Sequence, residues 1–243
     1  MKRVTPPVSR DVTGAATLER MAAAPRYNRW MFDRLRPWVG RRVLEIGAGI
    51  GNMSAFLVDQ TRVERVVLTD TEPDYLGRLR ERFAGRSQVS VAELRLPAVS
   101  PALVAERLDT VVCLNVLEHI EDDRASLRAM HDLLQPGGRL VLLVPSLRAL
   151  YGTLDEALGH FRRYVPAELS EKLGAAGFRL RHLEYFNLAG VPGWWVAGRV
   201  LRRRLIPTGA LRWYEALVPL FRLERLLPWR IGQSLIAIGE VPA

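Results

Sequence analysis

Short apolar runs alternate with amphipathic stretches along most of this chain of 243 residues. The runs are rich in Val, Leu and Ile, which is typical of strands buried on both faces, and the stretches between them have apolar residues at helical spacing. The pattern predicts strands at 42–46, 64–69, 88–94, 109–114, 139–144, 178–186 and 234–238, and helices at 28–38, 52–59, 73–84, 122–134 and 167–176. This alternation indicates an α/β protein with a doubly wound parallel sheet.

Three segments lie outside the alternation. Residues 1–27 read as a polar N-terminal arm, and residues 146–164 show no period. Residues 188–231 are rich in apolar and aromatic residues, and we expect two or three short helices there, separated by Pro207, Pro219 and Pro228. The simplest organisation is one domain, 28–243, that carries 188–231 as a helical insert or lid before the last strand.

The positive charge is concentrated in this insert. The chain has a formal net charge of +9, and residues 188–231 alone contain eight arginines against two glutamates. One interpretation is a lid or an oligomer contact with its arginines in solvent. The other is a surface for an anionic membrane or a lipid-linked substrate. Nucleic acid is disfavoured, because the charge is confined to one insert and no nucleic-acid motif accompanies it.

Cysteine content and hydropathy set the expected compartment. A single cysteine excludes a disulfide framework, and no apolar run approaches the roughly 20 residues that cross a bilayer. We therefore expect a cytoplasmic protein, with peripheral membrane association as an option. A monomer or a homodimer is expected.

A glycine-rich turn follows the first predicted strand. Gly47, Gly49 and Gly51 occupy alternate positions, where glycine allows positive φ and close approach of a ligand to the main chain. Asp70 ends the next strand, 23 residues after Gly47, about where a carboxylate accepts the ribose hydroxyls of an adenosine. The two features predict a nucleoside ligand at the carboxyl ends of the strands.

Four blocks of sequence resemble the class I S-adenosylmethionine-dependent methyltransferases, in their ubiquinone-methyltransferase-like small-molecule branch. They are VLEIGAGIG at 43–51, LTD at 68–70, LNVLEHI at 114–120 and LLQPGG at 133–138. The resemblance implies a Rossmann-like, seven-stranded, mostly parallel sheet whose last strand, 234–238, is antiparallel. It also implies S-adenosylmethionine as cofactor and methyl transfer to oxygen, nitrogen or carbon of a small-molecule acceptor, with an anionic or lipid-linked metabolite as one option. The alternative is a catalytically silent partner subunit or cofactor sensor on the same fold.

The resemblance also assigns the cofactor contacts, residue by residue, to the ends of the first four strands. Glu93 stands where members of the family often have Asp. The expected contacts are Glu45, Gly47, Ala48, Gly49, Gly51, Asn52, Asp70, Thr71, Glu93, Leu94, Asn115 and Val116.

Acceptor contacts are expected in the loop after the fifth strand. An imidazole with a pKa near neutrality suits removal of a proton, so His160 is the candidate general base, with a loop histidine bonded to backbone as the alternative. His119 is a second candidate, although the resembled branch uses this position to support local structure. No metal ligand is assigned. The expected acceptor-binding residues are Tyr27, Tyr151, Arg163, Tyr164 and Trp194.

Overall fold

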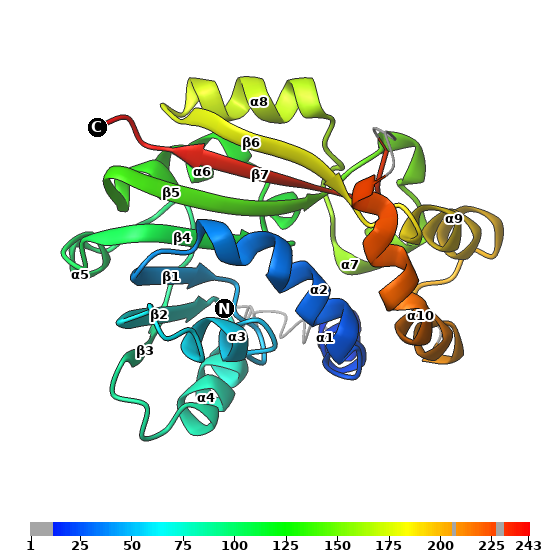
Figure 1. The fold of residues 1–243 in the computed structure, drawn as a ribbon, viewed down its shortest axis with the longest axis horizontal. Coiled ribbons are helices and arrows are strands. Elements are labelled where there is room, and N and C mark those ends of the chain that lie inside the picture. The colour runs from blue at the N-terminus through cyan, green and yellow to red at the C-terminus, as the bar shows by residue number, and fades with distance from the viewer. Residues whose placement is uncertain (1–11, 206–207, 227–230) are drawn as a thin grey trace, which may run out of the picture.

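Seven strands form one mixed sheet at the centre of the protein (Figure 1). A computed structural model describes residues 12–205, 208–226 and 231–243. The strand order is β3-β2-β1-β4-β5-β7-β6, and β7 runs antiparallel to both of its neighbours. The doubly wound sheet with an antiparallel last strand is thereby confirmed. The strands are β1 Arg42–Ile46, β2 Arg65–Asp70, β3 Val89–Glu93, β4 Leu108–Leu114, β5 Leu134–Pro145, β6 Arg179–Phe186 and β7 Ser234–Glu240.

Two apolar cores cover the two faces of the sheet, because successive residues of a strand point to opposite sides. Val43 of β1 belongs to one core and Leu44 to the other. The first core takes in residues of α2 (Pro25–Leu35), α3 (Ser54–Val58) and α4 (Pro73–Arg82), and the second takes in residues of α5 (Pro101–Val104), α6 (Asp123–Asp132) and α8 (Pro166–Ala175). Helices on both faces explain why the strands read as continuous apolar runs.

The strand order reverses between β1 and β4, which pair in parallel at the centre of the sheet. In open α/β sheets, ligands bind beyond the carboxyl ends of the strands at such a switch point. Figure 1 shows α1 (Val12–Ala22), α7 (Thr153–Leu158), α9 (Gly190–Trp195) and α10 (Thr208–Phe221) at the end of the sheet to which the parallel strands point. These four helices lie at the end of the sheet where the site is expected.

The N-terminal arm is helical where the structure describes it. Residues 12–22 form α1, and the helix expected at 28–38 is instead α2, which begins at Pro25. Regular helix ends at Leu35, and a 3₁₀ turn, η1, covers Arg36–Trp38. Pro37 has no amide hydrogen, so it cannot continue the helical ladder.

The non-periodic segment and the insert contain short helices. Segment 146–164 holds a 3₁₀ turn, η3 (Arg148–Leu150), and α7, which ends at Leu158 and is followed by Gly159 in the left-handed conformation. In the insert, α9 continues into a π-type turn, η4 (Val196–Val200), and α10 is followed by η5 (Arg222–Leu226).

The expectation that Pro219 separates two helices was wrong. Pro219 lies inside α10, while Pro207 and Pro228 fall outside the described residues. None of the helices in the described part of the chain combines the length and apolar character that a bilayer span requires.

Candidate functional site

The glycine-rich turn follows β1, and three of its residues have positive φ angles: +69° at Gly47, +55° at Gly49 and +83° at Gly51. Space is as restrictive as conformation, because a Cβ at Gly47 would lie 2.4 Å from a methyl group of Val116. Ala48 is buried and donates its amide to the carbonyl of Thr69 on β2. The turn therefore presents bare main chain at the carboxyl end of β1, as predicted.

Asp70 ties this turn to the end of β2. One carboxylate oxygen accepts from the Gly49 amide at 2.8 Å, and the other accepts from the amides of Thr71 at 2.8 Å and Glu72 at 3.1 Å. The main-chain carbonyl of Asp70 accepts from the amide of Leu94, just beyond β3. The ends of three strands are thus joined through one residue.

Glu45 lies beneath the turn, with its carboxyl group hydrogen-bonded to the Ser54 hydroxyl at 2.6 Å. Only 4% of the residue is exposed. Burial raises the pKa of Glu45 to about 7, although the bond from Ser54 acts in the opposite direction. As placed here, Glu45 supports the turn and the start of α3 from below.

The other expected cofactor contacts also lie along this edge. Glu93 is exposed at the end of β3, and Asn115 is exposed after β4 with a φ of +53°. The Asn52 side chain donates to the carbonyl of Leu18 in α1 at 3.1 Å. Leu18 also packs over the turn, since a Cβ at Gly49 would lie 3.0 Å from its methyl group. Helix α1 therefore covers the turn.

A second group of polar side chains surrounds Asp155 of α7, which is fully buried. Its carboxylate accepts from His160 Nδ1 at 2.9 Å, from Arg163 Nε at 2.8 Å and from Trp194 Nε1 at 3.1 Å. Burial alone would raise the pKa of Asp155, but the bonds from His160 and Trp194 and the Arg163 charge together hold it below its ordinary value. Asp155 thus orients His160 through Nδ1 and leaves Nε2 on the opposite side of the ring.

Glu118 and His119, from the turn after β4, meet His160 on that opposite side. One oxygen of Glu118 lies 4.0 Å from His160 Nε2, and the two imidazole rings stand edge to face with centroids 4.7 Å apart. Glu118 is fully buried, and burial raises its pKa to about 8. Among the described residues, neither oxygen of its carboxyl group has a hydrogen-bond partner. His119 is exposed, so this cluster opens to solvent on one side.

Arg163 was expected to bind the acceptor, but it does not face an open site. It is buried, bonded to Asp155 and to the carbonyl of Ser146, and its guanidinium lies 5.0 Å from the centre of the Trp194 ring. Burial lowers the pKa of Arg163. In this structure Arg163 and Trp194 therefore position the Asp155–His160 pair.

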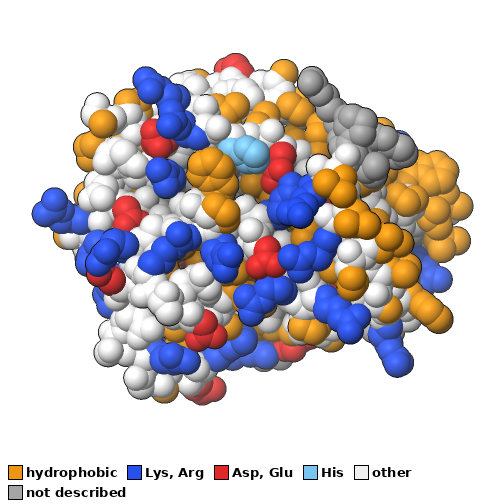
Figure 2. Space-filling view, viewed as in Figure 1, with side chains coloured by type: hydrophobic (Ala, Val, Ile, Leu, Met, Phe, Trp, Pro, Cys, Tyr) orange, Lys and Arg blue, Asp and Glu red, His pale blue; other side chains and the backbone are white. Residues whose placement is uncertain are grey.

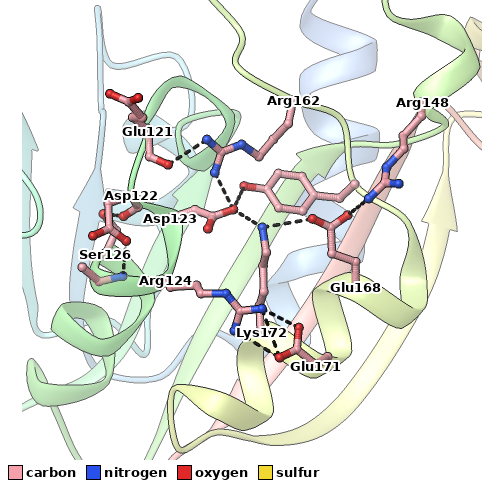
Figure 3. A network of polar contacts seen from close by, with 12 residues as sticks. Glu121, Asp122, Asp123, Arg124, Ser126, Arg148, Arg162, Glu168, Glu171 and Lys172 are labelled. Carbon is pink, nitrogen blue, oxygen red and sulfur yellow. Dashed lines mark hydrogen bonds and ion pairs between the residues drawn. The ribbon is translucent and has the colours of Figure 1, made fainter.

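Tyr164 also departs from the prediction of acceptor contact. It is fully buried, and its hydroxyl donates to Asp123 at 2.9 Å. Arg162 and Lys172 pair with the same carboxylate (Figure 3). This network holds the segment after His160 against the start of α6 and the second half of α8, so Tyr164 is an anchor of the loop.

The other two tyrosines expected to bind the acceptor, Tyr151 and Tyr27, instead contribute to packing in this structure. The Tyr151 hydroxyl donates to the main-chain carbonyl of His160 at 2.7 Å, which holds the loop closed. Tyr27 packs among the rings of Trp30, Phe186 and Tyr214, and burial raises its pKa to about 12. Tyr27 therefore joins α2 to α10.

Sequence reasoning missed Glu118 and Asp155. Glu118 stood inside one of the quoted blocks, next to a strand end, and Asp155 stood five residues before His160. An acidic residue close to a candidate histidine was the available signal for both.

Comparison with known proteins fits this geometry. A family model described as "Methyltransferase domain" matches residues 44–140. A probable S-adenosylmethionine-dependent methyltransferase of Mycolicibacterium smegmatis is 30% identical over 195 residues, which cover 76% of this chain and 72% of that protein. A ubiquinone biosynthesis O-methyltransferase of Xanthomonas euvesicatoria is 31% identical, over 58% of this chain and 64% of its own length.

Other matches are to much larger proteins, or to solved structures with lower sequence identity. The chain spans only 6% and 5% of two polyketide synthases, from Penicillium shearii and Strobilurus tenacellus. A solved complex of the Haloferax volcanii Trm112 methyltransferase activator with a methyltransferase matches with a TM-score of 0.68 and 16% identity, over 98% of this chain and 100% of the other. At that identity the match concerns the fold alone.

Proposed function

Because this chain belongs to the S-adenosylmethionine-dependent methyltransferases and uses S-adenosylmethionine as its cofactor, we propose that it methylates a hydroxyl group of a lipid-linked small molecule at an anionic membrane surface. The main supporting observation is the insert, which exposes aromatic and aliphatic side chains among arginines beside the acceptor end of the site. Oxygen is favoured as the methylated atom because relatives over more than half of the chain are named O-methyltransferases.

The first half of the site fits the cofactor. The turn exposes main chain at Gly47, where a Cβ would collide with Val116, and a carboxylate offers about four acceptor positions, of which Asp70 uses three. The glycine turn would hold the methionine part and Asp70 the ribose. S-adenosylmethionine supplies an electrophilic methyl group, so the protein has to align the acceptor oxygen and exclude water.

The second half suits a hydroxyl acceptor, whose proton must leave during the reaction. Asp155 fixes Nδ1 of His160, so Nε2 is the nitrogen available toward Glu118 and His119. In the proposed function, Nε2 of His160 accepts the proton of the acceptor hydroxyl or orients this hydroxyl by a hydrogen bond. The loop anchored at Asp123 keeps this imidazole in place.

The insert surface consists of exposed apolar side chains of α9, η4, α10 and η5. Trp213 alone is 76% exposed. Figure 2 shows hydrophobic side chains gathered where Figure 1 places α9 and α10, with basic side chains next to them. Monomeric soluble proteins rarely expose apolar patches of this kind without a binding role. Its members are Trp195, Val196, Val200, Leu201, Trp213, Leu217, Leu220, Leu223 and Leu226, and exposed arginines 199, 202, 203, 204 and 212 accompany them.

The insert is bonded directly to the acceptor end. Trp194 donates to Asp155, and the Thr153 hydroxyl of α7 reaches the carbonyls of Gly198 at 3.0 Å and Arg203 at 2.7 Å. An acceptor whose apolar tail lies in a membrane under the insert surface would therefore have a short path to His160. Arginines among apolar side chains suit anionic headgroups, each worth about 1 kcal/mol near the surface.

Vesicle flotation tests the membrane part. The wild type should float with vesicles that contain phosphatidylglycerol at low salt and be released at high salt, because the Debye length falls from about 10 Å at 0.1 M to about 3 Å at 1 M. Replacing Arg202, Arg203 and Arg204 by Gln should remove most of this binding. The matched control replaces exposed arginines 80, 95 and 128, which removes the same charge far from the insert. No flotation at low salt, or equal loss in both triple variants, would refute membrane docking.

The acceptor is tested with methyl-labelled S-adenosylmethionine and a bacterial lipid extract. We expect label in a solvent-extractable compound as an ether, which survives mild alkali. Label confined to water-soluble compounds would contradict a lipid-linked acceptor, and alkali-labile label would contradict an ether.

A further inference from the structure

We propose that Glu118, His119 and His160 bind one divalent transition-metal ion at the acceptor end of the site. Each residue offers one ligand atom, and these atoms all lie within 4.8 Å of one another. Ligands of one ion at bond lengths near 2.1 Å are about 3 to 3.5 Å apart, so small side-chain rotations complete the site. Ion binding is independent of the proposed membrane acceptor, whereas the catalytic role given to the ion rests on the proposed hydroxyl methylation.

The carboxyl group of Glu118 gives independent support. It is fully buried, yet in the described part of the chain both of its oxygens lack a hydrogen-bond partner. A buried polar group without a partner costs roughly 1 to 3 kcal/mol, and native proteins seldom retain one without a reason. A cation between Glu118 and His160 Nε2, which are 4.0 Å apart, would satisfy this carboxylate.

His160 is oriented as a metal ligand usually is. Metal-binding histidines donate the second ring nitrogen to a carboxylate or carbonyl, which fixes the tautomer and increases the basicity of the ligating nitrogen. Here Nδ1 meets Asp155 at 2.9 Å, and Asp155 is held in turn by Arg163 and Trp194. The Nε2 lone pair is thereby directed toward Glu118 and His119.

The charges around the cluster are consistent with a divalent ion. The Arg163 guanidinium is offset by the Asp155 carboxylate, with which it is paired at 2.8 Å. The ionised Glu118 then leaves the cluster with one negative charge, and a divalent cation changes this to one positive charge. An oxygen anion of the acceptor would neutralise the remainder.

Two imidazoles and one carboxylate favour a first-row transition metal. Imidazole suits zinc, copper, iron and nickel, whereas magnesium and calcium prefer sites made only of oxygen ligands. Three protein ligands leave coordination positions open, as in catalytic zinc sites. His119 is exposed, which gives the ion and the acceptor a route in.

In the metal-bound enzyme, His160 is a ligand and the ion activates the acceptor. The hydroxyl oxygen binds the ion, which lowers its pKa, and its proton passes to a water molecule on the open side at His119. The oxygen then forms a bond to the methyl carbon as the carbon–sulfur bond breaks. The sulfonium sulfur keeps that electron pair and becomes a neutral thioether. Open coordination positions favour an acceptor with a second oxygen beside the methylated hydroxyl, because both can bind the ion.

Titration calorimetry on chelator-treated, desalted protein tests the site. Zn²⁺ or Ni²⁺ should bind with one ion per chain, and His119→Ala should weaken binding at least tenfold. The side chain is exposed, so the fold should tolerate its loss. Glu118→Gln keeps the size of the buried side chain and should have the same effect. His182→Ala, in β6, is the matched control and should bind as the wild type does. Absence of saturable binding by either ion, or equal binding by the His119 variant, would overturn the proposal.

A second measurement separates this proposal from the proposed function. Methyl transfer from labelled S-adenosylmethionine to the lipid extract is followed in the presence of chelator and again after addition of Zn²⁺; turnover should fall at least 100-fold and then recover. Full turnover in chelator would refute the role of the ion while the methylation stands. Stoichiometric ion binding without any labelled lipid would contradict the acceptor class while the site stands. Calorimetry with S-adenosylmethionine on each variant checks that it remains folded.

Discussion

Replacing Glu45 by Gln should remove a large part of the pH dependence of stability. Glu45 is buried under the glycine turn, and burial raises its pKa from 4.5 to about 7. The folded state therefore holds a proton that the unfolded state releases between these two values. Its stabilising effect is complete below pH 4.5 and is lost as pH rises through 7, at roughly 1.4 kcal/mol per pKa unit. Between pH 5 and pH 8 this side chain alone should lower the free energy of unfolding by about 2 to 3 kcal/mol.

Urea unfolding of the wild type and of Glu45→Gln at both pH values measures the effect, without cofactor. Other titrating groups are common to the two proteins and cancel in the difference. We expect the variant to gain about 2 to 3 kcal/mol relative to wild type on going from pH 5 to pH 8. Glu93→Gln, exposed at the end of β3, should show no such change. The same wild-type-to-variant difference at both pH values would refute the burial argument.

Three further substitutions test the turn, the histidine and the loop anchor. Gly47→Ala should weaken S-adenosylmethionine binding at least tenfold by calorimetry, because Val116 occupies the space of the new Cβ. Gly85→Ala, with a similar positive φ and open space around it, should change only stability. His160→Ala should reduce turnover by at least about 100-fold with unchanged cofactor affinity, and near-normal turnover would remove it from the mechanism. Tyr164→Phe should lower the unfolding free energy by about 1 kcal/mol in urea, since a buried bond to Asp123 is lost, and no loss would contradict the anchor.

The sheet and the glycine turn could be predicted because their signals are local. A strand covered on both faces must be apolar throughout, so β7 was expected at 234–238 and is found at Ser234–Glu240. The glycine turn follows β1 directly and needs positive φ at alternate residues. The position of Asp70 follows from the length of one strand–helix–strand unit.

Side-chain roles after β5 could not be read from the sequence, because they depend on residues far away in the chain. Tyr164 is of a residue type that could contact an acceptor, but its hydroxyl donates a hydrogen bond to Asp123, which lies 41 residues earlier. Helix α7 has only six residues, too few to show a helical period. Asp155 therefore seemed part of an irregular loop, although it collects donors from its own helix, the following loop and the insert.

Asp155 connects the two halves of the proposed function. Its carboxylate orients His160, neutralises Arg163 and accepts the indole N–H of Trp194, which belongs to the insert. A buried carboxylate stays ionised only while enough donors and cations face it, so loss of any one of these partners raises its pKa and loosens His160. The geometry of the acceptor cluster therefore depends on the insert being docked. The surface proposed to bind the membrane and the histidine proposed to meet the acceptor are in this way held by the same buried carboxylate.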